Sequence, residues 1–295
     1  MNLKSKKSSD PRALLAAMCA AGLAAAAAPS LAQDTPAPRK AFRVCQDPNN
    51  MPFSSTKGGG IENRLAELFA KELGLPVEYY SFPQRLAFVR NTLRYKLPGQ
   101  DYPCDIIMGV PAGFDQVSVT RPYYRSTYAL VFAPGKGLDN VKTIDDFLAV
   151  DRAVLGKLRI GVYDRSPASE WMNRHQLVEQ GVPYAIMSAD PAQYPGEIIE
   201  KDLAAGKIDA AIVWGPIAGY FAKQVTSVKL TVVPMRSEKN IKFDYPIAMG
   251  VRYGEREWKQ QIETLIEKRQ PEITAILREF GVPLVEDEAA PAARQ

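Results

Sequence analysis

The sequence FRVCQDPNNMPF, which spans Phe42–Phe53, is a short apolar strand followed by a polar turn. The strand ends near Cys45, and the turn residues Asp47–Asn50 break it. A run of glycines, Gly58–Gly60, leads from the turn into an amphipathic helix, whose apolar face carries Ile61, Leu65, Leu68, Phe69 and Leu73. Such a strand, turn and helix form the first half of a parallel α/β unit, in which ligands bind beyond the carboxyl ends of the strands. We therefore expect Asp47–Phe53 to lie at the mouth of a binding site.

The first residues have the pattern of an export signal. An uncharged Ala/Leu run leads to the small-residue pattern Ser30–Ala32, and it is preceded by the basic residues Lys4, Lys6, Lys7 and Arg12. We expect a signal peptide over residues 1–32, with cleavage after Ala32, and a Pro/Ala linker over residues 33–41. The Ala/Leu run is too short to cross a bilayer, and no later stretch has the ~20 apolar residues of a spanning helix. This pattern predicts the export of a soluble protein without a membrane segment.

The charge balance argues against a nucleic-acid partner. The 295 residues include 37 Lys and Arg and 33 Asp and Glu, and the signal holds four of the basic and one of the acidic residues. Export therefore leaves a net charge of about +1 and no basic stripe of the kind that binds nucleic acid. A mature chain of this length can bury one large core or two smaller ones.

Two similar sets of α/β elements follow one another along the chain. Each contains a buried strand, Cys104–Val110 in the first set and Lys207–Trp214 in the second, with the near-continuous apolar run typical of a parallel sheet covered on both faces. In the first set, apolar residues at helical spacing predict a helix from Pro83 to Leu97. In the second set, we expect one of the strands at Tyr184–Met187. Each set is long enough to form one lobe.

Five motifs follow one another along the chain and read RVCQDPNNMPFS, FPQRLAFVRNTL, CDIIMGVPAGFD, TRPYYRSTYALVF and IDAAIVWGPIAGYF. In this order they resemble the motifs of the MxaJ and XoxJ family, the J proteins of methanol-oxidation operons. The order of elements also resembles the type II, amino-acid-binding kind of periplasmic solute-binding proteins. In that fold two lobes, each a mostly parallel sheet flanked by helices, are joined by two crossing strands and close by hinge motion. The resemblance covers Arg43 to about Val285 and implies crossings at Tyr128–Ala133 and Phe243–Val251.

The resemblance also implies a domain division and a function. Residues 42–133 and 244–285 form lobe 1, residues 134–243 form lobe 2, and residues 286–295 are a charged, Ala-rich tail that we expect to be disordered. The J family is periplasmic and is encoded with methanol dehydrogenases that depend on pyrroloquinoline quinone (PQQ). Its inferred role is to help mature or activate that enzyme. We therefore expect a monomeric accessory protein that binds the dehydrogenase, with its cytochrome c as a further candidate partner.

Two charged clamps of the amino-acid-binding members are missing from this sequence. Those members hold the ligand's carboxylate with an Arg after the third strand, where Val110–Asp115 has none. They hold the ammonium with an Asp at the end of the second buried strand, where this chain has Trp214. An ordinary amino-acid carrier is disfavoured, although another polar set could replace the clamps. The candidate cleft residues are Asp47, Asn49, Asn50, Phe53, Arg85, Pro111, Tyr163, Asp164, Arg165, Ser166 and Trp214.

Catalytic constellations are scarce in the sequence. His175 is the only histidine, so neither a Ser–His triad nor a multi-His metal site can be built unless carboxylates supply the remaining groups. The run Gly58–Gly60 lacks the spacing and the Lys of a phosphate-binding loop. We therefore expect no catalytic residue, no metal site and no cofactor bound by this chain, and the PQQ and metal belong to the expected partner.

Cys45 and Cys104 are the two cysteines of the mature chain. The exported compartment allows a disulfide between them, and the two strands that carry them are neighbours in this fold class. The strand register argues the other way, because Cys45 lies near the end of its strand and Cys104 at the start of its own. Their Cα atoms could then exceed the ~7 Å limit for a bridge. The sequence leaves both outcomes open.

Three functions remain compatible with the sequence. The first is the accessory protein of a quinoprotein methanol dehydrogenase. The second is the substrate-binding subunit of an ABC importer for a small solute other than an amino acid. The third is an enzyme on the same fold, of which the wider family has a few dehydratases. The missing clamps count against an amino-acid importer, and the absence of an acid–base pair counts against an enzyme.

Overall fold

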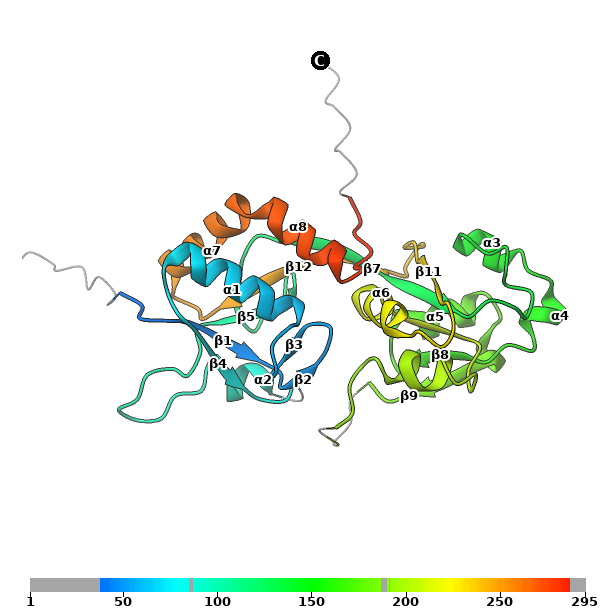
Figure 1. The fold of residues 1–295 in the computed structure, drawn as a ribbon, viewed down its shortest axis with the longest axis horizontal. Helices are drawn as coiled ribbons and strands as arrows, with labels where there is room; N and C mark the ends of the chain where they lie inside the picture. The colour runs from blue at the N-terminus through cyan, green and yellow to red at the C-terminus, as the bar shows by residue number, and fades with distance from the viewer. Residues whose placement is uncertain (1–37, 85–86, 187–189, 191, 287–295) are drawn as a thin grey trace, which may run out of the picture. The chain divides into compact units, whose positions relative to one another are not determined.

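The computed structural model describes residues 38–84, 87–186, 190 and 192–286 (Figure 1). The expected signal peptide, its cleavage site, most of the linker, Arg85 and tail residues 287–295 lie outside these ranges. Within them, no helix has both the length and the apolar character needed to cross a membrane.

Lobe 1 is built around strand β1, which runs parallel between β4 and β5. The start of helix α1 packs on the segment that follows β1, because Gly60 lies against the backbone of Phe53, where a Cβ atom would lie 2.2 Å from the Phe53 carbonyl oxygen. Figure 1 shows α1, α7 and α8 along one side of this sheet. The elements are β1 (Phe42–Gln46), β2 (Asn49–Asn50), β3 (Ser54–Ser55), α1 (Ile61–Leu73), β4 (Val77–Ser81), α2 (Phe88–Asn91), β5 (Ile106–Pro111), β6 (Ser118–Val119), β7 (Tyr124–Phe132), β12 (Asp244–Val251), α7 (Arg256–Lys268) and α8 (Gln270–Glu279).

Lobe 2 repeats the parallel arrangement with β10, β8 and β9 side by side. Its core is dominated by Phe147 and Trp171, both fully buried. The elements are α3 (Ile144–Leu148), α4 (Arg152–Leu155), β8 (Ile160–Tyr163), α5 (Pro167–Arg174), η1 (Val178–Gln180), β9 (Gly181–Tyr184), η2 (Ile198–Leu203), β10 (Ala210–Trp214), α6 (Gly215–Gln224) and β11 (Thr231–Pro234).

Strand β7 belongs to both lobes. Its first half, up to Thr127, pairs with β12 of lobe 1, and its second half, from Tyr128, pairs with β10 and β11 of lobe 2. The chain returns beside the same point, where the Tyr128 amide donates to the Phe243 carbonyl oxygen at 3.1 Å. Both crossings implied by the sequence are therefore present, and one continuous path of strands runs β4-β1-β5-β12-β7-β10-β8-β9.

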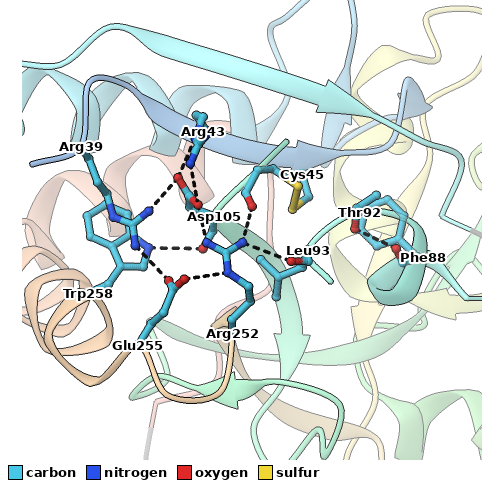
Figure 2. Close-up of a disulfide and its surroundings, with 11 residues drawn as sticks. Arg39, Arg43, Cys45, Phe88, Thr92, Leu93, Asp105, Arg252, Glu255 and Trp258 are labelled. Carbon is cyan, nitrogen blue, oxygen red and sulfur yellow. Dashed lines mark hydrogen bonds and ion pairs between the residues drawn. A yellow bond between two sulfur atoms is a disulfide. The ribbon is translucent and has the colours of Figure 1, made fainter. Parts of the chain in front are cut away.

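Cys45 and Cys104 form a disulfide, with their Cα atoms 5.3 Å apart (Figure 2). The objection from strand register does not apply, because β5 begins at Ile106 and Cys104 lies in the bend before it. The bridge closes a loop with a sequence separation of 59 residues. Both cysteines are buried against Phe88, Val89 and Leu93.

Next to the disulfide, the fully buried carboxylate of Asp105 is surrounded by three guanidinium groups (Figure 2). Arg39 and Arg43 lie 2.7 and 2.8 Å from its oxygens, and Arg252 forms a third ion pair. Burial by itself raises the pKa of Asp105, but hydrogen bonds from Arg43 and Arg252 outweigh burial and hold it below the usual value. The described chain is therefore tied to lobe 1 from Arg39 onward, inside the segment expected to be a linker.

Two sequence expectations about the elements were wrong. The helix expected from Pro83 to Leu97 is reduced to α2. The chain leaves this helix at Thr92, whose hydroxyl donates to the Phe88 carbonyl oxygen at 2.7 Å. In place of the strand expected at Tyr184–Met187, of which Met187 lies outside the described residues, the structure has β9, which ends at Tyr184 and contains Pro183. Proline is tolerated there because β9 is an edge strand.

We predict that Asp105→Asn lowers the free energy of unfolding by about 3–5 kcal/mol, because it leaves three arginines without their shared counter-ion. Since the pKa of Asp105 is depressed, its contribution is present above the ordinary value of 3.8 and is lost as the pH falls through the folded-state pKa. Urea unfolding between pH 3 and pH 7 measures both effects. The exposed Asp115→Asn is the matched control, with an expected change below about 0.5 kcal/mol. Equal stability of the two variants would contradict the prediction.

Candidate functional site

The carboxyl ends of four strands meet at one groove with a volume of about 700 Å³. Asp47 follows β1, and Tyr163, Tyr184 and Trp214 are the last residues of β8, β9 and β10. Residues of both lobes line it, as expected for a ligand site in an α/β sheet protein. The other lining residues are Asn49, Asn50, Gln84, Tyr128, Ser166, Pro183, Ala185, Ile186, Gln193, Tyr194, Pro195, Glu197, Ile198, Lys201, Asp202 and Ile217.

A second hollow, of about 780 Å³, lies along α8. It is lined by Gln270, Thr274 and Arg278 of that helix and by residues that begin β7. Because no carboxyl end of a parallel strand contributes to this hollow, the groove at the strand ends is the stronger candidate for the site.

Aromatic rings form much of the groove wall. Trp214 pairs with Tyr128 across β10 and β7, and their rings meet edge to face with centroids 5.5 Å apart. Tyr163 and Tyr184 make a similar contact at 6.3 Å. Burial, with a smaller effect of Tyr245, raises the pKa of Tyr128 to about 12. Burial is also the main cause of the raised pKa of Tyr163 and Tyr184, so these phenols are neutral in the physiological range.

The phenol hydroxyls fix the rings in place. Tyr163 donates to the Pro195 carbonyl oxygen at 2.7 Å, and Tyr184 donates to Asp202 at 2.8 Å. Tyr194 donates to Glu200 at 2.5 Å. Each hydroxyl is therefore already engaged, and a guest meets mainly the faces and edges of the rings.

The turn after β1 forms the polar side of the groove. The carboxylate of Asp47 accepts hydrogen bonds from the amides of Asn49, at 2.7 Å, and of Gln84. The side-chain amide of Asn50 donates to the Gln84 side chain at 2.7 Å, and that of Asn49 donates to the Ala192 carbonyl oxygen of lobe 2 at 3.3 Å. This turn is held by its own polar residues, as the Asp-Pro-Asn-Asn sequence indicates.

Helices of lobe 2 supply further polar groups. Ser166 is the N-cap residue of α5 and is buried, yet its hydroxyl makes no hydrogen bond within the described structure. The π-helical segment η2 and its N-cap Glu197 bring Lys201 and Asp202 to the groove. Lys201 pairs with Glu197 at 2.6 Å and lies over the ring of Tyr194, 5.4 Å from its centroid.

The structure brings together six of the eleven candidate residues, Asp47, Asn49, Asn50, Tyr163, Ser166 and Trp214. Pro111, Asp164 and Arg165 are exposed and do not line the groove. Phe53 is turned into the apolar cluster of lobe 2 that contains Phe221. Arg85 lies outside the described residues, and a role of any candidate in binding stays a prediction.

Three tyrosines of the groove, Tyr128, Tyr184 and Tyr194, were not among the candidate residues. Tyr184 was omitted because the sequence predicted a strand that begins at this residue, whereas β9 ends there. Tyr128 was omitted because its position opposite Trp214 depends on the antiparallel register of two strands that are far apart in the sequence. Tyr194 lies in a loop that carries no periodic pattern, so no sequence signal identified it.

The groove has no arginine among its described lining residues, and Lys201 is their one cationic side chain. After β5, Asp115 is exposed, and its carbonyl oxygen accepts from the Tyr253 hydroxyl at 2.8 Å. After β10, Trp214 packs against Tyr128 and Tyr245. The chain therefore has neither the arginine nor the aspartate at the two positions where the amino-acid-binding members clamp a zwitterion. Within the described ranges, no group of three or more His, Cys, Asp or Glu side chains could hold a metal ion.

Glu62, in the first turn of α1, is a buried carboxyl group beneath the Asp47 turn. The pKa of Glu62 is raised to about 8, mainly by burial and to a smaller extent by the charge of Asp47. Its side chain also occupies the space beside Gly109, where a Cβ atom would lie 2.7 Å from its Oε1.

Two α/β lobes that share β7 and open a groove at their strand ends define a periplasmic binding protein. The protein MoxJ of Methylorubrum extorquens is 31% identical over 299 residues, which cover 92% of this chain and 94% of MoxJ. The crystal structure of the periplasmic binding protein XoxJ from Methylobacterium extorquens is 39% identical, with a TM-score of 0.66 over 83% of this chain and 100% of XoxJ. The crystal structure of MxaJ from Methlophaga aminisulfidivorans is 25% identical in sequence, with a TM-score of 0.67 over 83% of this chain and 100% of MxaJ.

The chain belongs to the MoxJ, MxaJ and XoxJ family. Amino-acid-binding proteins share the fold alone, for example an ancestral arginine-binding protein bound to glutamine, at 20% identity and a TM-score of 0.53. No protein-family model matches the sequence.

We predict that Glu62→Gln reduces the pH dependence of stability on the alkaline side. The pKa of Glu62 is raised above the ordinary 4.5, so its contribution is fully present below that value and is lost as the pH rises through about 8. Between these limits the free energy of unfolding falls by about 1.4 kcal/mol per pH unit. Glutamine does not ionise, so the variant lacks this pH dependence. Urea unfolding at pH 5 and pH 8.5 tests this, with exposed Glu179→Gln as control. Parallel pH profiles for the native protein and Glu62→Gln would refute the assignment.

Proposed function

We propose that this chain is a periplasmic accessory protein that binds a PQQ-dependent methanol dehydrogenase and helps to mature or activate it. Family membership is the observation that carries the proposal. The groove supports it, since its aromatic wall includes Trp214 and Tyr194 and its described lining residues lack a charged clamp for a zwitterion. A concave aromatic surface of this kind can accept a protruding segment of another protein.

The remaining parts of the proposal follow from the sequence and the class of relatives. The chain is exported, and the signal peptide is cleaved after Ala32. It acts by binding rather than by catalysis, as a monomer, and PQQ and the metal ion belong to the dehydrogenase. The cytochrome c of that enzyme is a further candidate partner. The relatives support the periplasmic assignment, since they include proteins described as periplasmic binding proteins.

We predict that the purified mature protein does not bind the standard amino acids. At the two positions where the amino-acid-binding members clamp a zwitterion, this chain has Trp214 and no arginine, so titration calorimetry against an amino-acid panel shows no heat. A dissociation constant near 1 µM, equivalent to about −8 kcal/mol, would favour an importer subunit. Binding of a small solute other than an amino acid, with loss of its transport on gene deletion, would support the importer alternative directly.

We predict that Trp214→Ala and Tyr194→Ala each weaken binding to the purified dehydrogenase at least tenfold, about 1.4 kcal/mol, because buried aromatic anchors dominate such interfaces. Biolayer interferometry measures the affinity, and thermal unfolding shows whether each variant remains folded. Tyr79→Ala is the control, since Tyr79 is 38% exposed and lies on β4, outside the groove lining.

Deletion of the gene, complemented with each variant, extends the test to the cell. Active dehydrogenase falls in the deletion strain while its polypeptide persists, and the native gene and Tyr79→Ala restore activity better than Trp214→Ala. Full dehydrogenase activity in the deletion strain would overturn the proposed function.

A further inference from the structure

We propose that the groove receives a cationic side chain, a lysine or arginine on a protruding segment of the partner protein. This inference rests on the proposed function, because it specifies the chemistry of the partner at the same groove. It depends on three observations, namely the charges that line the groove, the faces of its aromatic rings, and one buried hydroxyl group without a partner.

The charges of the groove lining are mainly negative. Its described residues carry three carboxylates, Asp47, Glu197 and Asp202, and one ammonium group, Lys201. Asp202 is paired outside the lining with Lys207 at 2.9 Å, and hydrogen bonds from Lys207 and Tyr184, against the effect of burial, keep its pKa below the usual range. The Asp202 carboxylate therefore stays ionised at neutral pH, and a lining with three carboxylates and one ammonium group attracts a basic guest more than an acidic one.

The aromatic wall suits the same guest. A cation is attracted to the face of a tyrosine or tryptophan ring within about 6 Å of its centroid. The groove already contains one such contact, because Lys201 lies 5.4 Å from the centroid of Tyr194 while its ammonium group pairs with Glu197 at 2.6 Å. A guest lysine or arginine reproduces this arrangement, with its aliphatic stem packed along the rings.

Ser166 supplies an acceptor for the head group of the guest. This residue lines the groove and is only 7% exposed, and its buried hydroxyl oxygen has no hydrogen-bond partner in the described structure. An unpaired buried hydroxyl is unfavourable until a partner arrives. An ammonium or guanidinium group is a donor without acceptor capacity, so the head group of a guest that reaches this oxygen can satisfy it.

Two peptides that differ in charge alone test the inference. One is an acetylated, amidated pentapeptide of alanine with arginine at its centre, and the other has citrulline, which keeps the shape of arginine without its charge. With 15N-labelled protein, the indole signal of Trp214 reports binding, whereas Trp171 and Trp258 are buried elsewhere. We expect at least fivefold tighter binding of the arginine peptide, and a larger excess at low salt. Equal binding of the two peptides, or tighter binding of a phenylalanine peptide, would overturn the inference.

A matched pair of variants locates the charge. Asp202→Asn keeps an oxygen that can accept from Tyr184 but removes one negative charge of the groove. Asp145→Asn removes the same charge from an exposed position on α3. We expect Asp202→Asn to weaken the arginine peptide at least threefold and Asp145→Asn to leave its affinity unchanged. Equal affinities for the two variants would show that groove charge does not select the guest.

The inference and the proposed function fail in different ways. If the dehydrogenase binds with an affinity that is indifferent to Asp202→Asn, and the arginine peptide does not perturb Trp214, the inference is wrong and the accessory role survives. If the arginine peptide binds as expected and the dehydrogenase does not bind at all, the cationic guest stands and the accessory role is wrong.

Discussion

The antiparallel pairing of β7 with lobe 1 on one side of Thr127 and with lobe 2 on the other is the constraint on which this structure depends. Since a strand has a fixed register with each neighbour, this pairing places Tyr128 opposite Trp214. The carboxyl ends of β1, β8, β9 and β10 thereby contribute to one groove, which neither lobe could form alone. The Asp105 ion cluster and the adjacent disulfide have a local role, since they fix the start of β5 and the segment around Arg39 within lobe 1.

The groove joins features that a small-solute site rarely combines. Neutral, hydrogen-bonded phenols keep the wall largely aromatic, while Asp47, Glu197 and Asp202 give it negative charge. The oppositely charged clamps of an amino-acid site are missing from the described lining, so a zwitterion gains little orientation there. A basic side chain on a larger partner uses both features, and the partner can add contacts on the rim.

Local patterns, such as the apolar run that ends at Cys45, predicted two similar sets of α/β elements, and the family resemblance implied the two-lobed fold and both crossings. Prediction from the sequence failed where tertiary context overrides local preference. Leu97 fits a helical spacing but is exposed after the helix ends at Asn91. In β9, Pro183 is acceptable only because the strand lies at an edge of the sheet. The strand therefore ends at Tyr184, where it was expected to begin, and Tyr184 was not recognised as a groove residue. The disulfide could not be decided because Cys104 precedes the strand whose register was used.

The central claim, that the aromatic groove receives the methanol dehydrogenase, is tested most directly by photo-crosslinking in living cells. A photoreactive amino acid replaces Tyr194 in the groove or Tyr79 on β4, and crosslinked products are identified by mass spectrometry. Docking in the groove predicts a crosslink to the dehydrogenase from position 194 and none from position 79. A crosslink from position 194 to a permease subunit, or dehydrogenase crosslinks of equal yield from both positions, would contradict it.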